Sequence, residues 1–91
     1  MGLKTTTVCL GYQQITDLSS AVALTVPSGA TLALIVAETQ NVRWRDDGTN
    51  PTASVGMPIF VGASLSYDGD LSRIKFIQET ASAKLNISYY A

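Results

Sequence analysis

Gly29-Ala30-Thr31-Leu32, followed by Val42-Arg43-Trp44-Arg45, begins a pattern that the chain repeats as Gly62-Ala63-Ser64-Leu65 followed by Ile74-Lys75-Phe76-Ile77. Each half-unit contains a turn glycine, the start of an apolar strand, a polar interval and an alternating strand. Alternation with a period of two places one set of side chains in a core and the other set outside. Two such half-units in one short chain indicate a closed or two-layered β-structure.

Strand signals recur along the rest of the chain at short, regular spacings, and no helical period is sustained. Residues 11–20 are polar, and residues 17–20 are expected to form a single helical turn or a loop. The pattern predicts strands over 5–10, 21–26, 32–37, 42–45, 52–55, 59–61, 65–67, 74–78 and 84–90. We therefore expect one all-β domain over residues 1–91, with about eight short antiparallel strands in a jelly-roll-like sandwich or compact barrel.

The inward positions of these strands predict a hydrophobic core. The expected core residues are Val22, Leu24, Val26, Leu34, Val42, Trp44, Leu65, Ile74, Phe76, Leu85 and Ile87. Trp44 and Phe76 occupy matching places in the two half-units, which favours positions in opposite layers. Pro27-Ser28-Gly29 and the Asp-Gly pairs at 47–48 and 68–69 predict turns.

The composition indicates a surface that meets other subunits. Of the 91 residues, 46% are hydrophobic and only 14% are charged, whereas a typical soluble domain has about 25% charged residues. A domain this small has a large surface relative to its volume, so part of the apolar surplus is expected at a subunit contact. The alternative is an isolated β-domain with a neutral surface of serine and threonine.

Charge and hydropathy exclude several classes of protein. A net charge of −1 argues against a nucleic-acid-binding protein, which would normally carry a basic face. The longest apolar run, residues 32–37, is too short to cross a bilayer. Met1-Gly2-Leu3-Lys4 leads into threonines rather than into the apolar segment of a signal peptide. We expect neither a nucleic-acid partner nor a membrane partner.

The residue types also disfavour an enzyme. The chain has no histidine, and Cys9 is its single cysteine. Histidine-assisted nucleophilic catalysis and cysteine- or histidine-based zinc sites are therefore not expected. A hydrolase with paired carboxylates, using Glu38 or Glu79, remains an alternative. We predict no catalytic residue and no cofactor.

Two acidic turns offer oxygen ligands that a calcium ion would accept. They are Asp46-Asp47-Gly48-Thr49-Asn50 and Asp68-Gly69-Asp70. Neither has the spacing of an EF-hand loop, and aspartate and asparagine are common turn residues because their side chains hydrogen-bond the nearby backbone. The turn role is favoured, and no metal site is predicted.

Five aromatic residues could together form a platform for stacking a sugar ring. They are Tyr12, Trp44, Tyr67, Tyr89 and Tyr90. Tyr89 and Tyr90 are adjacent, so in a strand they point to opposite faces and one of them leaves the core. The outer tyrosine suits a subunit interface or the chain end.

Three stretches carry a resemblance to a known group of proteins: 42–58 (VRWRDDGTNPTASVGMP), 67–77 (YDGDLSRIKFI) and 83–90 (AKLNISYY). Together they resemble small virion-associated proteins of tailed bacteriophages, and the likeness covers residues 20–91. This resemblance implies a structural role in the virion, with capsid decoration or cementing as the leading function. It implies synthesis in the bacterial cytoplasm, with the major capsid protein or other virion proteins as partners. The alternative function is a small carbohydrate-binding module on a host-recognition device of the tail or head fibre.

The apolar run at residues 32–37 suggests where subunits meet. Ala33, Ile35 and Ala37 lie on the face opposite Leu34 and Val36, and both faces are apolar. One face fills the core, and the other is expected to contact a neighbouring subunit. We predict that Ala33, Ile35, Ala37 and Tyr90 form the interface of a symmetric homo-oligomer. A trimer is expected, because cement proteins commonly sit on local three-fold axes.

Overall fold

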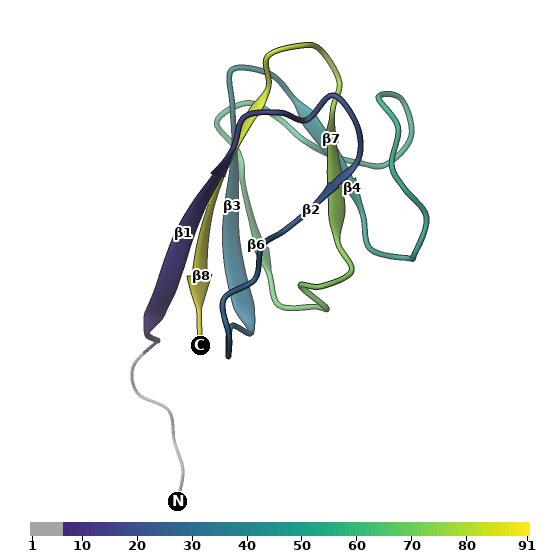
Figure 1. The fold of residues 1–91 in the computed structure, drawn as a ribbon. Coiled ribbons are helices and arrows are strands. Elements are labelled where there is room, and N and C mark those ends of the chain that lie inside the picture. Colours follow the sequence, from purple (N-terminus) through teal and green to yellow (C-terminus); the bar gives the residue numbers. More distant parts are fainter. Residues whose placement is uncertain (1–6) are drawn as a thin grey trace, which may run out of the picture.

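In the computed structural model, which describes residues 7–91, two four-stranded antiparallel sheets pack face to face (Figure 1). Sheet 1 has the strand order β1-β8-β3-β6, and sheet 2 has the order β2-β7-β4-β5. The strands are β1 (Cys9–Ile15), β2 (Val22–Ala23), β3 (Leu32–Glu38), β4 (Val42–Arg45), β5 (Met57–Ile59), β6 (Ser64–Tyr67), β7 (Lys75–Gln78) and β8 (Lys84–Tyr90). The predicted all-β class with about eight antiparallel strands is confirmed.

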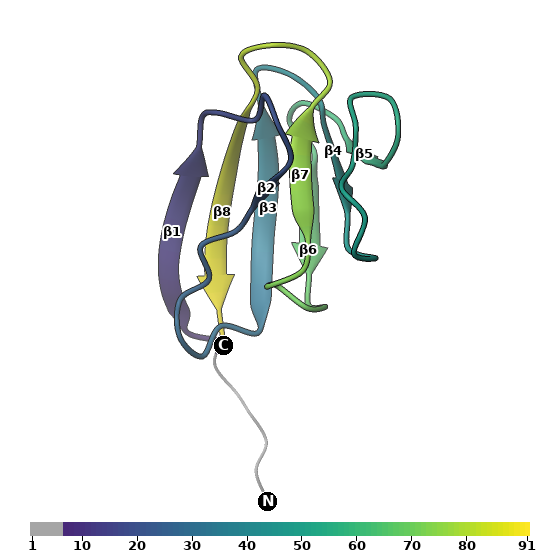
Figure 2. The ribbon, with the colours of Figure 1, turned by 45° about the vertical axis from the view of Figure 1, so that its right-hand side comes forward.

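Each repeated half-unit contributes one strand to each sheet. β3 pairs with β6 in sheet 1, and β4 pairs with β7 in sheet 2 (Figure 2). Gly29 precedes β3 with a φ of 86°, and Gly62 precedes β6 with a φ of 83°. Glycine adopts this left-handed conformation without the steric cost that a Cβ would bring. The repeat in the sequence therefore corresponds to a repeat in the pairing of the strands.

Trp44 and Phe76 do not lie in opposite layers, so that prediction is wrong. They are direct partners across β4 and β7, within one sheet. Each strand of the first half-unit pairs with the equivalent strand of the second. This pairing brings the matching positions of the two half-units side by side.

The inward face of β3 is the reverse of the one predicted. Ala33, Ile35 and Ala37 are fully buried, whereas Leu34 has 39% of its surface exposed. Sequence alternation could not decide between the two faces because both are apolar. The register decides it: Ala33 lies between Tyr67 of β6 and Tyr89 of β8. A small side chain between two inward-facing tyrosines satisfies the close packing of an interior.

Most of the other expected core residues contribute to the core. The fully buried ones are Leu24, Val42, Ile74, Phe76, Leu85 and Ile87, and those partly buried against them are Val22, Val26, Trp44 and Leu65. The structure adds buried residues that were not predicted. These are Ile15, Leu18, Ala33, Ile35, Ala37, Ile59, Tyr67, Leu71, Ala83 and Tyr89.

The N-terminal strand begins and ends later than predicted. Residues 5–6 of the expected strand lie outside the described residues, and β1 continues through residues 11–15, where no strand was predicted. Its partner is β8, which lies far away in sequence, and a bulge between Cys9 and Gly11 interrupts the register. Gln13 faces inward, where it accepts a hydrogen bond from the Tyr89 hydroxyl at 2.7 Å. A polar side chain with a buried partner therefore fits this strand.

Two predicted strands in the middle of the chain also differ. Residues 52–55 form a tight turn in which the backbones of Thr52 and Val55 bond each other. The following strand is Met57–Ile59 rather than 59–61. It lies at the edge of sheet 2, where Pro58 is tolerated because one side of the strand needs no ladder hydrogen bond.

The reversed face of β3 gives a direct test with two neighbouring variants. Ile35→Ala is expected to lower the free energy of unfolding by about 2–5 kcal/mol, because it leaves a cavity between the sheets. Leu34→Ala is expected to change it by less than about 0.5 kcal/mol, as is usual for a surface position. Urea unfolding at low protein concentration measures both. A larger loss for Leu34→Ala than for Ile35→Ala would contradict the observed orientation of β3.

Candidate functional site

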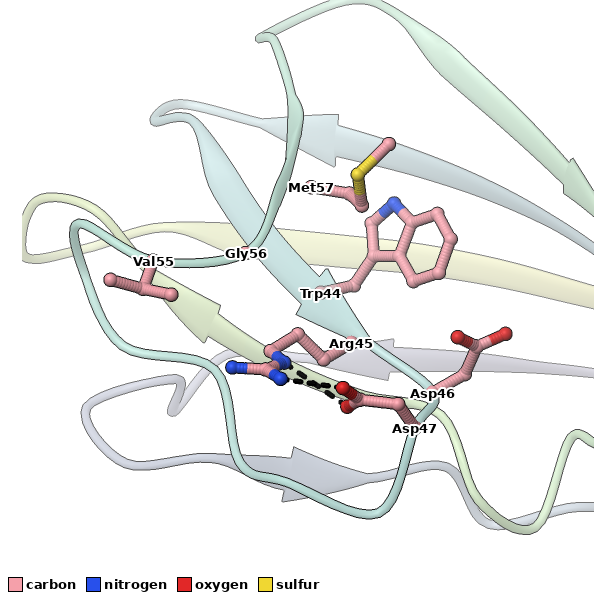
Figure 3. A pocket seen from close by; sticks show the side chains of 7 residues that line it. All are labelled: Trp44, Arg45, Asp46, Asp47, Val55, Gly56 and Met57. Atoms are coloured by element: carbon pink, nitrogen blue, oxygen red, sulfur yellow. Dashed lines mark hydrogen bonds and ion pairs between the residues drawn. The ribbon is translucent and has the colours of Figure 1, made fainter.

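A cavity of about 590 Å³ lies between the end of β4 and the loop that returns to β5 (Figure 3). The two limbs of this loop are joined where Trp44 pairs with Met57. The residues that line the cavity are Trp44, Arg45, Asp46, Asp47, Val55, Gly56 and Met57. They come from two short segments of the 42–58 stretch, so one local hairpin builds the whole site.

The returning limb of the loop is held against β4 by Arg43. Its Nη1 donates a hydrogen bond of 2.8 Å to the carbonyl oxygen of Gly56. Its Nε lies 2.7 Å from Oε2 of Glu79, an ion-pair contact without the direction of a hydrogen bond. Arg43 thus ties the loop to the end of β7, behind the cavity.

A side chain at position 56 is disfavoured both by the backbone conformation and by the lack of space for a Cβ atom. Its φ is 147°, in a region that other residues rarely adopt. A Cβ there would lie 3.1 Å from the carbonyl oxygen of Trp44 and 3.2 Å from the Cβ atoms of Arg43 and Pro51. The close approach of the loop to β4, which closes one side of the cavity, therefore depends on glycine.

Trp44 forms the aromatic wall of the cavity. Its indole contacts the ring of Tyr67 edge to face, with 5.8 Å between ring centroids and an interplanar angle of 66°. Such T-shaped pairs are favoured by the charge distribution of aromatic rings and fix their orientation. Figure 3 shows the indole with Met57 on one side and Asp46 on the other. Met57 and Val55 are 57% and 53% exposed and add apolar surface at the rim.

The polar wall contains one guanidinium and two carboxylates. Arg45 donates from Nε to Oδ1 of Asp47 at 3.1 Å and from Nη2 to Oδ2. This two-bond pair holds the pKa of Asp47 at about 2 and raises the pKa of Arg45. Asp46 lies beside the pair and accepts a hydrogen bond of 2.6 Å from the Tyr67 hydroxyl through Oδ2. The cavity thus presents donors and acceptors next to an aromatic surface.

The sugar platform of five aromatic residues is not assembled. Tyr67 and Tyr89 are buried, and Tyr12 and Tyr90 lie in sheet 1 on β1 and β8. Trp44 alone of the five lines the cavity, with Tyr67 packed against it. The sequence signal for this site was Trp44 and the Asp-Gly turn that follows it. The contribution of Met57 could not be predicted, because it depends on the pairing of β4 with β5.

The predicted interface residues are divided between the core and the surface. Ala33, Ile35 and Ala37 are buried between the sheets, so their assignment to a subunit interface is wrong. Tyr90 is partly exposed and pairs with Leu32 of β3. The surface of β3 is formed instead by the alternate residues. We define the outer face of sheet 1 by its apolar residues Tyr12, Leu32, Leu34, Val36 and Tyr90. Their cross-strand partners Ser64, Ser66, Asn86 and Ser88 lie on the same face.

The acidic turns have structural partners. Asp70 accepts hydrogen bonds from the backbone N and the hydroxyl of Ser72, and Asp47 accepts one from the backbone N of Thr49. These bonds are the turn role that the sequence favoured. Over residues 7–91, no three His, Cys, Asp or Glu side chains are grouped so that they could hold a metal ion.

Within the described residues, no helix is long and apolar enough to cross a membrane. No protein-family model, curated protein or solved structure matches the chain. The site is therefore interpreted from its own geometry.

The two buried tyrosines give a test at high pH. Burial raises the pKa values of Tyr67 and Tyr89 to about 12, and for Tyr67 the Asp46 carboxylate adds to the effect. Because the unfolded chain releases these protons near pH 10, their contribution to stability is complete below that pH. It is lost as the pH rises through 12. Urea unfolding between pH 9 and 12 measures the loss, and Tyr67→Phe should reduce its slope. A stability that does not change across this range would contradict the buried, neutral state of both groups.

Proposed function

We propose that this protein is a structural component of a tailed-phage particle, a capsid decoration or cement protein that assembles as a symmetric homo-oligomer. A trimer is the expected assembly, and the major capsid protein or another virion protein is the expected partner beyond a second copy. The resemblance of residues 42–58, 67–77 and 83–90 to small virion proteins supports the class of function. The outer face of sheet 1 supports assembly through contacts between subunits.

The observation that carries the proposal is the apolar, uncovered outer face of sheet 1. Leu34 of β3 is 39% exposed and Tyr12 of the edge strand β1 is 64% exposed, with Ser88 of β8 between them. Leu10 of β1 is 37% exposed. Residues 7–91 form no helix that would cover this face. Exposed apolar side chains that gather on one face of a domain commonly mark a protein contact.

The edge of sheet 1 favours contact with a second copy. β1 is an edge strand of seven residues, and Figure 2 shows it at the border of the sheet, next to β8. Its sequence, CLGYQQI, contains neither a charged residue nor a proline. Charged residues and prolines are two of the devices that protect exposed edges from pairing with other chains, and the bulge between Cys9 and Gly11 is the one that β1 carries. A neighbouring copy that covers β1 and the outer face would remove this edge from solvent.

A hydrogen-bond network among the apolar side chains would fix the orientation of the partner in such a contact. Asn86 accepts hydrogen bonds from the side chains of Tyr12 and Gln14, and it donates one of 2.8 Å to Glu38. Interfaces commonly combine an apolar centre with a polar rim that fixes the orientation of the partner. Glu38 and Glu79, the carboxylates of the hydrolase alternative, are bonded to Asn86 and Arg43. These contacts support a structural role for both.

Charge on the outer face is expected to prevent assembly. Leu34→Glu should yield a folded monomer, because residue 34 is at the surface and a buried carboxylate at an interface is costly. Val55→Glu, at a position that is 53% exposed in the loop before β5 of sheet 2, is the control and should assemble normally. Size-exclusion chromatography with light scattering gives the mass, and circular dichroism checks the fold. A wild-type protein that remains monomeric at micromolar concentration would contradict self-association.

Quantitative mass spectrometry of purified phage particles tests the role in the virion. We expect the protein in every particle, at a copy number that matches the symmetry of the capsid shell. A copy number that matches a single ring would assign it to the neck or tail instead. Its absence from purified particles would contradict the proposal.

A further inference from the structure

We propose that the cavity beside Trp44 is a binding site for a neutral saccharide, with the indole as the stacking surface and the Arg45–Asp47 pair and Asp46 as hydrogen-bonding partners. The site is distinct from the outer face of sheet 1. It is formed by β4, β5 and the loop between them, in sheet 2. The proposal therefore does not depend on the proposed function.

The indole of Trp44 is partly buried against the core and lines the cavity. The edge-to-face contact with Tyr67 fixes it from the core side, and the Tyr67 hydroxyl is itself anchored on Asp46. Figure 3 shows the face of the ring system turned toward the viewer, below Met57. The C–H groups of a pyranose ring carry partial positive charge and pack on the negative face of an aromatic ring. Trp44 offers the surface that this contact requires.

The polar groups match the hydroxyl groups of a sugar. Each hydroxyl both donates and accepts hydrogen bonds, so adjacent hydroxyls are best bound by a donor and an acceptor side by side. The Arg45–Asp47 pair provides this combination, already held in place by two hydrogen bonds. Asp46 uses Oδ2 for Tyr67, and among the contacts of residues 7–91 its Oδ1 accepts no hydrogen bond. The Arg45–Asp47 pair and Asp46 line the same cavity as Trp44, and Figure 3 shows the pair on the other side of the β4 ribbon from the indole.

The charge balance favours a neutral ligand over an ion. The lining residues carry two negative charges and one positive charge. The two carboxylates would repel a phosphate or an acidic sugar, and the guanidinium would oppose an ammonium group stacked on Trp44. A neutral saccharide meets no like charge and uses all three groups.

The site is formed in advance of binding. Arg43 fixes the returning limb through Gly56, and Glu79 fixes Arg43. A preformed site loses less conformational entropy when a ligand binds. The volume of about 590 Å³ lies within the range of roughly 300–1,000 Å³ that is usual for small-molecule pockets.

Titration with defined sugars tests the proposal on the full-length protein. Trp44 is the single tryptophan, so its fluorescence reports on the site directly. A glycan array of neutral oligosaccharides is screened first, and di- and trisaccharides of glucose, galactose and N-acetylglucosamine are then titrated to millimolar concentration. We expect a saturable change in Trp44 fluorescence with at least one of them. Amide resonances of 44–47 and 55–57 should shift in the ¹⁵N spectrum.

Variants on the two walls separate binding from folding. Trp44→Phe keeps an aromatic ring against Tyr67 but reduces the stacking surface, and Arg45→Gln removes the charged pair at an exposed position. Each variant is expected to weaken sugar binding about tenfold or more. An effect of this size follows from the loss of one or two hydrogen bonds, or of a stacking contact of similar free energy. Affinities are measured by NMR so that the loss of the tryptophan does not matter. Tyr12→Ala, an exposed aromatic residue on sheet 1, is the control and should bind like the wild type.

Three outcomes would overturn the proposal. The first is that no neutral sugar on the array or in the titrations perturbs Trp44 or residues 55–57. The second is sugar binding that Tyr12→Ala abolishes and that Trp44→Phe and Arg45→Gln leave unchanged. The third is a response to choline, used as a quaternary ammonium probe, without any response to sugars. All three are independent of the mass of the oligomer, so failure here is distinguishable from failure of the proposed assembly.

Discussion

The register of β3 between β6 and β8 is the constraint on which the rest of the structure depends. Ala33 lies between Tyr67 and Tyr89, and Ile35 lies between Leu65 and Ile87. A shift of one residue would place two tyrosines beside the larger Leu34 and turn Ile35 to solvent, because neighbouring residues of a strand point to opposite faces. The packing of small against large side chains in sheet 1 therefore selects one register.

Both functional surfaces follow from this register. With Tyr67 turned inward, its ring supports Trp44 from the core side and its hydroxyl bonds Asp46. These two contacts position the aromatic wall of the cavity in sheet 2. The same register turns Leu34 outward, at the centre of the face that we assign to subunit contact. One set of contacts in the core thus connects a pocket on one sheet with the surface on the other sheet that we propose for assembly.

Much of the fold could be predicted from the sequence, because alternation and turn residues are local signals. The half-units at 29–45 and 62–77 correspond to strands that pair with each other, and the turn at Pro27 closes with a hydrogen bond from Ala30 to the Pro27 carbonyl. The orientation of 32–37 could not be predicted, since both of its faces are apolar. β1 was placed too early because its polar residues are satisfied by distant partners on β8. The cavity was not foreseen, because Met57 reaches Trp44 only through strand pairing.

The most direct test of the account is the exposure of the Leu34 and Ile35 methyl groups, measured by NMR with a soluble paramagnetic gadolinium complex. In dilute, monomeric protein we predict strong broadening of the Leu34 methyl signals and little effect on those of Ile35. As the concentration rises and the oligomer forms, the Leu34 methyl signals should become protected. Broadening of Ile35 with protection of Leu34 in the monomer would contradict the register of β3. Leu34 methyl signals that stay fully broadened at every concentration would contradict the use of the outer face for assembly.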